Sequence, residues 1–178
     1  MKLSIFCNTH ADAHARLPLQ LMSNLARVLG AELVVGVNDH NAKLTVLDWG
    51  VTRAVFTTDL ARQQCRGDWV LELHDDEAAS AAMVRWLWSG QYRDQCDWKF
   101  PLLCLWPDER SVLIAPKTFP NWQLRLRNQN NSGLVSFAPV SIESHALIDQ
   151  PTPTTGILAA KGDGAVPWTP QWTKPVNV

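Results

Sequence analysis

At the start of the chain, continuous runs of apolar residues alternate with a segment whose apolar residues are spaced as on one face of a helix. Residues 2–8 (KLSIFCN) are an apolar run bounded by polar residues, which predicts a buried strand. Apolar residues then recur at helical spacing over 15–30, which predicts an amphipathic helix ended by its final glycine. Its expected apolar face consists of Leu17, Leu21, Leu25 and Val28. Residues 31–39 predict the next strand, followed by a polar loop, NDHNAK, so this part of the chain predicts a βαβ unit with parallel strands.

The alternation of strands and helices continues beyond this unit. A strand is predicted over 52–58, and a short helix with Asp59 as its N-cap over 59–65. The apolar run 68–73 predicts another strand, and the Ala-rich segment 77–90 predicts a longer helix. This order predicts an α/β fold with a mostly parallel, Rossmann-like, doubly wound sheet.

After residue 90 the pattern changes to short apolar runs punctuated by prolines. Strands are predicted over 99–106, 111–115, 121–127 and 133–137. No long helical pattern separates these strands, so they predict antiparallel additions to the sheet in the C-terminal half. The sequence thus predicts one domain over 1–149 and a Pro-, Thr- and Gly-rich tail over 150–178, either wrapped on the surface as a loop or partly disordered.

Composition narrows the classes of protein. The chain has 178 residues, 46% of them hydrophobic and 19% charged, which is typical of a single globular domain. The net charge of −1 gives no general attraction to nucleic acid, so no nucleic-acid partner is expected. Four cysteines without metal-finger spacing, and no apolar run long enough to span a membrane, predict a cytoplasmic protein with reduced thiols and no transmembrane segment.

The segment 66–80 (RGDWVLELHDDEAAS) carries the most informative chemistry. Its apolar strand runs directly into His74, Asp75, Asp76 and Glu77. Adjacent carboxylates repel one another and are costly to desolvate unless a cation or hydrogen-bond donors compensate them. One interpretation is a helix N-terminus, where Asp76 and Glu77 complement the helix dipole. The other is a hard cation, Mn²⁺ or Mg²⁺, bound by carboxylate oxygens.

Polar residues also follow the other strands of the predicted parallel sheet. Asn8 ends the first strand, and Asn38 and Asp39 end the second. In an open parallel sheet the carboxyl ends of the strands share one edge, and ligands bind outside that edge. A divalent cation held by one or two carboxylates usually takes its other ligands from phosphate and water. The three strand ends therefore predict a site for a nucleoside diphosphate held through a metal ion.

The order of these segments resembles the nucleotide-sugar-binding half of the family 2 glycosyltransferases, which have the GT-A fold. The resemblance rests on SIFCNT, ELVVGVND and GDWVLEL running into HDDE, followed by FPNWQLRLRN and IESHAL, and it covers roughly residues 3–147. It implies a transferase that moves a sugar from a nucleoside diphosphate sugar to an acceptor that the sequence does not identify. It also implies assistance by Mn²⁺ or Mg²⁺.

The resemblance assigns roles to the residues at the strand ends. Asp39 matches the aspartate that binds the base, and Asn8 lies at the neighbouring strand end; a turn-forming Asp39 is the alternative. Asp76 matches a metal ligand, supported by Asp75 or His74.

The later segments supply further candidates. His145 matches a late histidine of the family and would complete the metal ligands; a structural or solvated histidine is the alternative. An inverting transfer also needs a general base within hydrogen-bond reach of the acceptor hydroxyl. Asp108, Glu109 and Glu143 are the candidates, and the sequence does not choose among them.

Departures from the family pattern favour a second interpretation. His74 stands where the family has an aspartate, and the segment between Asp39 and His74 is short for the family. These departures favour a non-catalytic GT-A-like binding or regulatory protein.

Two pairs of residues admit other interpretations. Arg125 and Arg127 alternate on a predicted strand, which favours a solvated strand face over contact with a diphosphate. Trp86 and Trp88 lie two apart on a predicted helix, so they point to different faces. A Trp-rich module that binds another protein is therefore a third interpretation. It expects one of these tryptophans to be exposed away from the strand ends, and the acidic cluster to face solvent.

Overall fold

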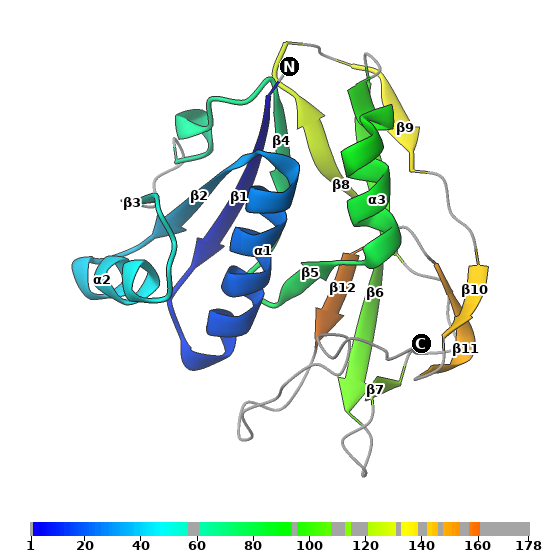
Figure 1. Cartoon of the computed structure of the whole chain (residues 1–178), viewed down its shortest axis with the longest axis horizontal. Helices are drawn as coiled ribbons and strands as arrows, with labels where there is room; N and C mark the ends of the chain where they lie inside the picture. Colours follow the sequence, from blue (N-terminus) through cyan, green and yellow to red (C-terminus); the bar gives the residue numbers. More distant parts are fainter. Residues whose placement is uncertain are drawn as a thin grey trace.

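The computed structural model describes residues 2–56, 61–93, 96–107, 113–114, 121–130, 133–138, 142–145, 148–153 and 157–160 (Figure 1). The α-helices are α1 (Arg16–Leu29), α2 (His40–Asp48) and α3 (Ala81–Ser89). Short 3-10 helices are η1 (Ala13–Ala15), η2 (Ala61–Gln64) and η3 (Gln91–Arg93). The strands are β1 (Leu3–Thr9), β2 (Glu32–Val37), β3 (Ala54–Phe56), β4 (Trp69–Glu72), β5 (Glu77–Ala79), β6 (Asp97–Pro107), β7 (Leu113–Ile114), β8 (Asn121–Asn128), β9 (Val135–Phe137), β10 (Ile142–His145), β11 (Ile148–Pro153) and β12 (Ile157–Ala160).

Most of the strands form one mixed sheet. Its order is β3-β2-β1-β4-β8-β6-β12-β5, and β7 and β9 also pair with β6. The four strands β1 to β4 are parallel, which confirms the expected α/β fold with a parallel N-terminal half. The expected antiparallel additions are confirmed for β8 and β7. For β9 the expectation is wrong, because this strand runs parallel to β6.

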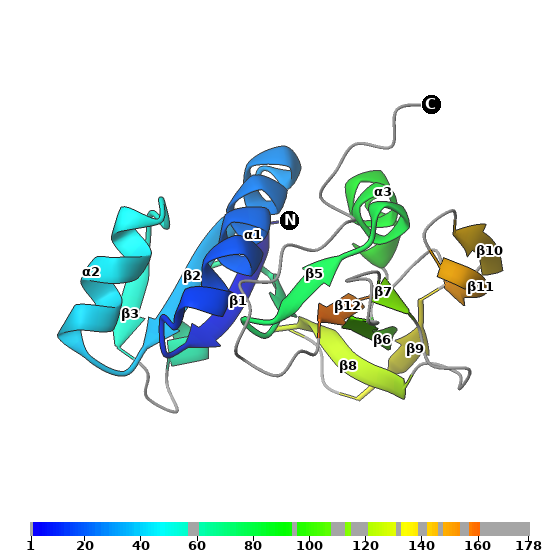
Figure 2. The ribbon, with the colours of Figure 1, turned by 90° about the horizontal axis from the view of Figure 1, so that it is seen from below.

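The three α-helices lie on one face of the sheet (Figure 2). The chain moves from β1 to β2 to β3 in one direction, so right-handed crossovers place α1 and α2 on the same side. On the opposite face Cys65, just after η2, packs against Phe6, Val34 and Val70. A doubly wound sheet has helices on both faces. Among the described residues the second face carries the 3-10 helix η2 where a short α-helix was expected, so the doubly wound arrangement is incomplete there.

Helix α1 has the expected bounds but turns a different face to the sheet. Gly30 ends it in the left-handed conformation, with φ 62°. The buried side chains are Leu19, Met22, Leu25 and Ala26. Of the expected stripe only Leu25 is buried, and Val28 is 49% exposed. Apolar residues occupy two adjacent faces of this helix, so the sequence pattern alone does not decide which face packs on the sheet. The face that does so carries Leu19 and Met22, which the expected stripe did not include.

The polar loop expected after β2 is instead the first turn of α2. Asp39 has an extended backbone, and its side chain accepts a hydrogen bond of 2.8 Å from the backbone N–H of Ala42. This N-cap satisfies one of the free N–H groups at the start of the helix. Only Ala42 and Val46 of α2 are buried, so the helix has too narrow an apolar face to show in the sequence pattern.

The helix expected from residue 77 begins later, because the acidic segment leads into a strand. Ser80 is the N-cap of α3, and its hydroxyl accepts from the backbone N–H of Met83 at 3.2 Å. Residues Glu77–Ala79 form β5, which pairs antiparallel with β12. Asp76 and Glu77 therefore do not cap a helix, and that interpretation of the acidic cluster is wrong.

The C-terminal segment expected as a tail contributes to the sheet. Strand β12 (Ile157–Ala160) lies between β5 and β6, parallel to β6. Strand β11 (Ile148–Pro153) pairs with β10 in a separate two-stranded sheet. The expected N-cap Asp59 lies outside the described residues.

A polar network joins β1 and β2 near their amino-terminal ends. The Ser4 hydroxyl donates to Glu32 at 2.6 Å, Arg53 donates to the same carboxylate at 2.7 Å, and the backbone N–H of Arg66 also donates to it. Burial raises the pKa of Glu32, but these hydrogen bonds and the charge of Arg53 outweigh it and hold the pKa below its ordinary value.

We expect Glu32 to stabilise the protein only when it is ionised. Its pKa in the folded state is lowered, so its contribution is present above the unfolded pKa of about 4.3 and is lost as pH falls below that value. The variant Glu32→Gln should therefore lower the free energy of unfolding by about 1–2 kcal/mol at pH 7 and by much less near pH 3. Urea unfolding at both pH values measures this. The exposed control Asp12→Asn should show little loss at either pH, and an equal loss for Glu32→Gln at both would contradict the expectation.

Candidate functional site

The topology singles out the carboxyl ends of β1 and β4. Strand β1 lies between β2 and β4 and is parallel to both (Figure 1). The chain leaves β1 toward β2 on one side and later returns to β4 on the other. The point where the strand order reverses is where open α/β sheets bind ligands, outside the carboxyl ends of the strands.

Side chains from three strand ends meet at this edge. The Thr9 hydroxyl, at the end of β1, donates to the Asp75 carboxylate at 2.8 Å and accepts from the backbone N–H of Ala11 at 3.0 Å. Asn38, after β2, lies 3.0 Å from His10 between their side-chain nitrogens. The expectation that the polar residues after β1, β2 and β4 lie along one edge is confirmed.

A buried ion pair supports the turn between β4 and β5. Arg125 of β8 donates from Nη2 to Oε1 of Glu77 at 2.7 Å, and the two side chains are 8% and 2% exposed. The other oxygen of Glu77 accepts from the backbone N–H of His74 at 2.8 Å. The backbone N–H of Glu77 donates back to the His74 carbonyl at 3.0 Å. Glu77 therefore links the turn to β8 through Arg125 and to the end of β4 through the backbone of His74.

The same arginine fixes the ring of His74. Nη1 of Arg125 lies 2.6 Å from Nε2 of His74. A guanidinium only donates, so Nε2 accepts, and the proton of the neutral ring is on Nδ1. Nδ1 lies 3.8 Å from Oε1 of Glu77.

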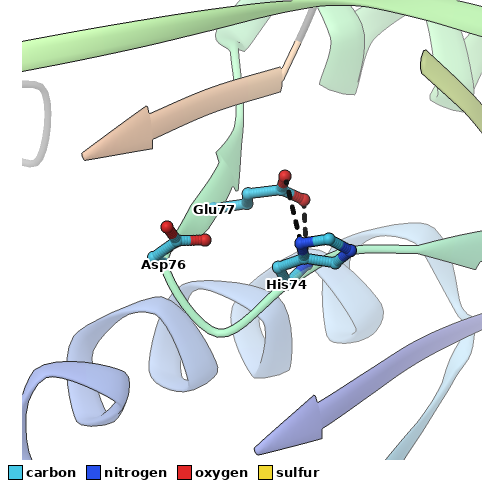
Figure 3. A group of neighbouring side chains, drawn as sticks. All are labelled: His74, Asp76 and Glu77. Atoms are coloured by element: carbon cyan, nitrogen blue, oxygen red, sulfur yellow. Dashed lines mark hydrogen bonds and ion pairs between the residues drawn. The ribbon is translucent and has the colours of Figure 1, made fainter. Parts of the chain in front are cut away.

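Three side chains at this turn lie close enough together to hold a metal ion. His74, Asp76 and Glu77 each place one ligand atom within 4.8 Å of the others, and they point toward one another (Figure 3). The carboxylate oxygens of Asp76 and Glu77 suit a hard divalent cation. The ring of His74 offers no free nitrogen lone pair while Arg125 donates to it. The oxygen donors therefore fit Mn²⁺ or Mg²⁺, whereas His74 fits only when Arg125 moves away.

The electrostatics at this edge are negative. Cys7 of β1 is completely buried. Burial raises the pKa of its thiol well above the ordinary range, and the charges of Asp75, Glu77 and Asp76 raise it further. The segment 75–77 brings three carboxylates, and Arg125 pairs with one of them. Carboxylates gathered in this way are groups that attract a cation.

The two expected nucleotide-binding residues lie at the same edge. Asn8 is exposed on β1, next to Thr9. Asp39 is exposed after β2, and its carboxylate is engaged as the N-cap of α2. The Asp39 carboxylate thus has a local structural role, as a helix N-cap and not as the turn-forming aspartate that was the alternative.

The later candidates are not brought to the site by any described contact. Asp108 and Glu109 lie outside the described residues. Glu143 and His145 belong to β10, which pairs with β11 in the separate sheet, and their side chains lie outside the described part.

Sequence reasoning missed two residues of the site. Thr9 ends a strand next to a recognised candidate, so its place in the chain was a usable signal. Arg125 was expected on a solvated strand face, which is wrong, because this residue is 7% exposed. The pairing of β8 beside β4 brings its side chain to His74 and Glu77, and no local pattern encodes that pairing.

The tryptophans of α3 point to different faces, as expected. Trp86 is 6% exposed, and its ring meets that of Trp98 at 4.9 Å between centroids. Trp88 is 69% exposed.

Comparisons with known proteins leave the family unassigned. No protein-family model matches the sequence, and no curated protein matches it. Within the described part of the chain, no helix is long and apolar enough to cross a membrane.

Proposed function

We propose that the chain binds a nucleoside diphosphate sugar at the carboxyl edge of β1 and β4 and transfers the sugar to an acceptor. The observation that carries this proposal is the Thr9–Asp75 hydrogen bond of 2.8 Å, which joins the two strand ends at the reversal of strand order. The acidic turn follows directly, and its ligand atoms lie within 4.8 Å of one another. The order of sequence segments that resembles family 2 glycosyltransferases supports the same function.

The chain's own residues have distinct roles in this proposal. Asp76 and Glu77 would hold Mn²⁺ or Mg²⁺, and a bound cation would supply Lewis-acid stabilisation of the departing diphosphate. Thr9 orients Asp75 at the strand end. Asn8 on β1 and Asp39 just after β2 would contact the nucleoside. The general base is to be sought among Asp108, Glu109 and Glu143.

A binding protein without turnover is the second candidate. It is favoured by Arg125, which already contacts His74 and Glu77, two of the three candidate ligands. A nucleotide that binds while its sugar is neither transferred nor hydrolysed would distinguish this candidate from the transferase. Release of nucleoside diphosphate from UDP- and GDP-sugars, with and without Mn²⁺, measures that difference.

Protein binding is the third candidate, and it is favoured by Trp88. This side chain is 69% exposed on α3, as an interaction surface would need. A variant Trp88→Ala should leave nucleotide binding unchanged under the transferase proposal.

We expect Mn²⁺ and one nucleoside diphosphate to raise the melting temperature of the protein together. A ligand at about a hundred times its dissociation constant stabilises by roughly 2.7 kcal/mol, a shift of about 5 to 10 °C for this size of domain. A thermal-shift panel of UDP, GDP, CDP and dTDP, each with and without Mn²⁺, measures this.

The variant Asp76→Asn provides the specificity test. It should abolish the Mn²⁺-dependent shift, whereas Asp12→Asn, at an exposed carboxylate before η1, should preserve it. The absence of a shift with every nucleotide, or an unchanged shift in Asp76→Asn, would contradict the proposed function.

A further inference from the structure

Arg125 contacts two of the three side chains that a cation at the acidic turn would use. Its two terminal nitrogens lie 2.7 Å from Oε1 of Glu77 and 2.6 Å from Nε2 of His74. Both contacts are made by a buried side chain, which is 8% exposed. A buried guanidinium with this geometry places a positive charge against two of the three candidate ligands.

The contact with His74 and the binding of a cation by that ring exclude each other. While Nε2 accepts from Arg125, the neutral ring carries its proton on Nδ1, so neither nitrogen has a lone pair for a metal. The conflict at Glu77 is electrostatic, because a divalent cation on the same carboxylate would lie close to the guanidinium in a poorly solvated place.

We propose that Arg125 is a latch on this site, which must give up His74 and Glu77 before a divalent cation binds all three ligands His74, Asp76 and Glu77. The inference rests on the proposed function only in that this turn binds a cation. In the latched state Glu77 is neutralised by Arg125, and in the open state the cation replaces the guanidinium. The latch keeps the buried Glu77 carboxylate compensated when no cation is bound.

The direct test compares the affinity for Mn²⁺ alone of the wild type, Arg125→Met and Arg127→Met. Arg127 is the matched control because it lies two residues further along the same strand. The electron paramagnetic resonance signal of free Mn²⁺ measures the affinity. Removal of the latch should tighten Mn²⁺ binding by about tenfold or more, because a like charge is taken out of a poorly solvated site. The control should bind Mn²⁺ as the wild type does.

The other outcomes each overturn the latch in a distinguishable way. Equal or weaker Mn²⁺ binding by Arg125→Met would overturn the latch and leave the cation site of the proposed function standing. An absence of Mn²⁺ binding in all three proteins would overturn both the latch and the cation site.

A measurement on the wild type covers the case in which Arg125→Met fails to fold. The guanidinium of a buried arginine that makes two hydrogen bonds gives slowly exchanging Nη–H signals in ¹⁵N NMR spectra. Titration with diamagnetic Mg²⁺ should remove or shift these signals of Arg125 in proportion to Mg²⁺ bound. Mg²⁺ binding with unchanged Arg125 signals would overturn the latch.

Discussion

Replacement of Glu77 by alanine is expected to lower the free energy of unfolding by about 3–5 kcal/mol, the cost of breaking a buried ion pair by removing one partner. Glu77 is 2% exposed and accepts from both Arg125 and the backbone N–H of His74. Without it, a buried guanidinium keeps its charge and loses its counter-ion. Urea unfolding of Glu77→Ala measures the loss directly.

A matched control and a double variant separate the ion pair from other effects. Glu72→Ala makes the same change at a half-buried carboxylate of β4 and should cost less than about 1 kcal/mol. The double variant Glu77→Ala with Arg125→Met removes both charges, so its loss should be smaller than the sum of the single losses. Additive losses in the double variant would show that the two side chains do not stabilise each other.

Substitution of Gly67 by alanine is expected to destabilise the protein by about 3 kcal/mol, at the upper end of the cost of overpacking a well-packed site. A Cβ at this position would lie 2.6 Å from both the backbone nitrogen and the hydroxyl oxygen of Ser4, and 2.8 Å from the carbonyl carbon of Leu3. The backbone of β1 cannot move away without losing its pairing with β4. The substitution would also disturb the 2.8 Å bond from the Gly67 N–H to Ser4.

The same substitution at Gly30 provides the contrast. A Cβ there meets nothing within 4 Å, and the only cost is the left-handed backbone with φ 62°. Gly30→Ala should therefore cost about 1 kcal/mol. Thermal unfolding of both variants compares them, and a loss at Gly67 no larger than at Gly30 would contradict the close packing of this glycine against β1.

The N-terminal half of the fold could be predicted because its signals are local. Strands β1, β2 and β4 each come from a short apolar run, and α1 ends at a glycine in the left-handed conformation. Helix α2 was not predicted, because its N-cap residue Asp39 lies in a polar segment and few side chains of the helix are buried. A polar cap before a weakly amphipathic helix has the same pattern as a loop.

Pairings between distant segments could not be predicted. Strand β5 has three residues, and it exists because Ile157–Ala160 pairs with it from the far end of the chain. Local sequence favours a helix at this position, since Ala-rich segments have high helix propensity. The start of α3 is therefore displaced to Ala81, and the acidic residues lie in a turn between two strands.

The candidate site likewise has one part that could be predicted from the sequence and one part that could not. The strand ends that meet at the sheet edge could be predicted, because parallel strands align their carboxyl ends. The partners of the acidic turn could not, because Arg125 reaches Glu77 across 48 positions of sequence. The burial of a strand side chain depends on what lies beside it in the sheet, which alternation in the sequence does not show.

The most direct measurement is the location of Mn²⁺ together with the nucleoside diphosphate that gives the largest thermal shift. Paramagnetic Mn²⁺ broadens nearby amide signals in ¹H–¹⁵N spectra of the protein. The amides of Thr9, Asp75 and Asp76 should broaden first, while that of Gly67, about 20 Å away near the other end of β1, should stay sharp. Broadening centred away from the carboxyl ends of β1 and β4, or no site-specific broadening, would contradict a nucleotide and metal site at this edge.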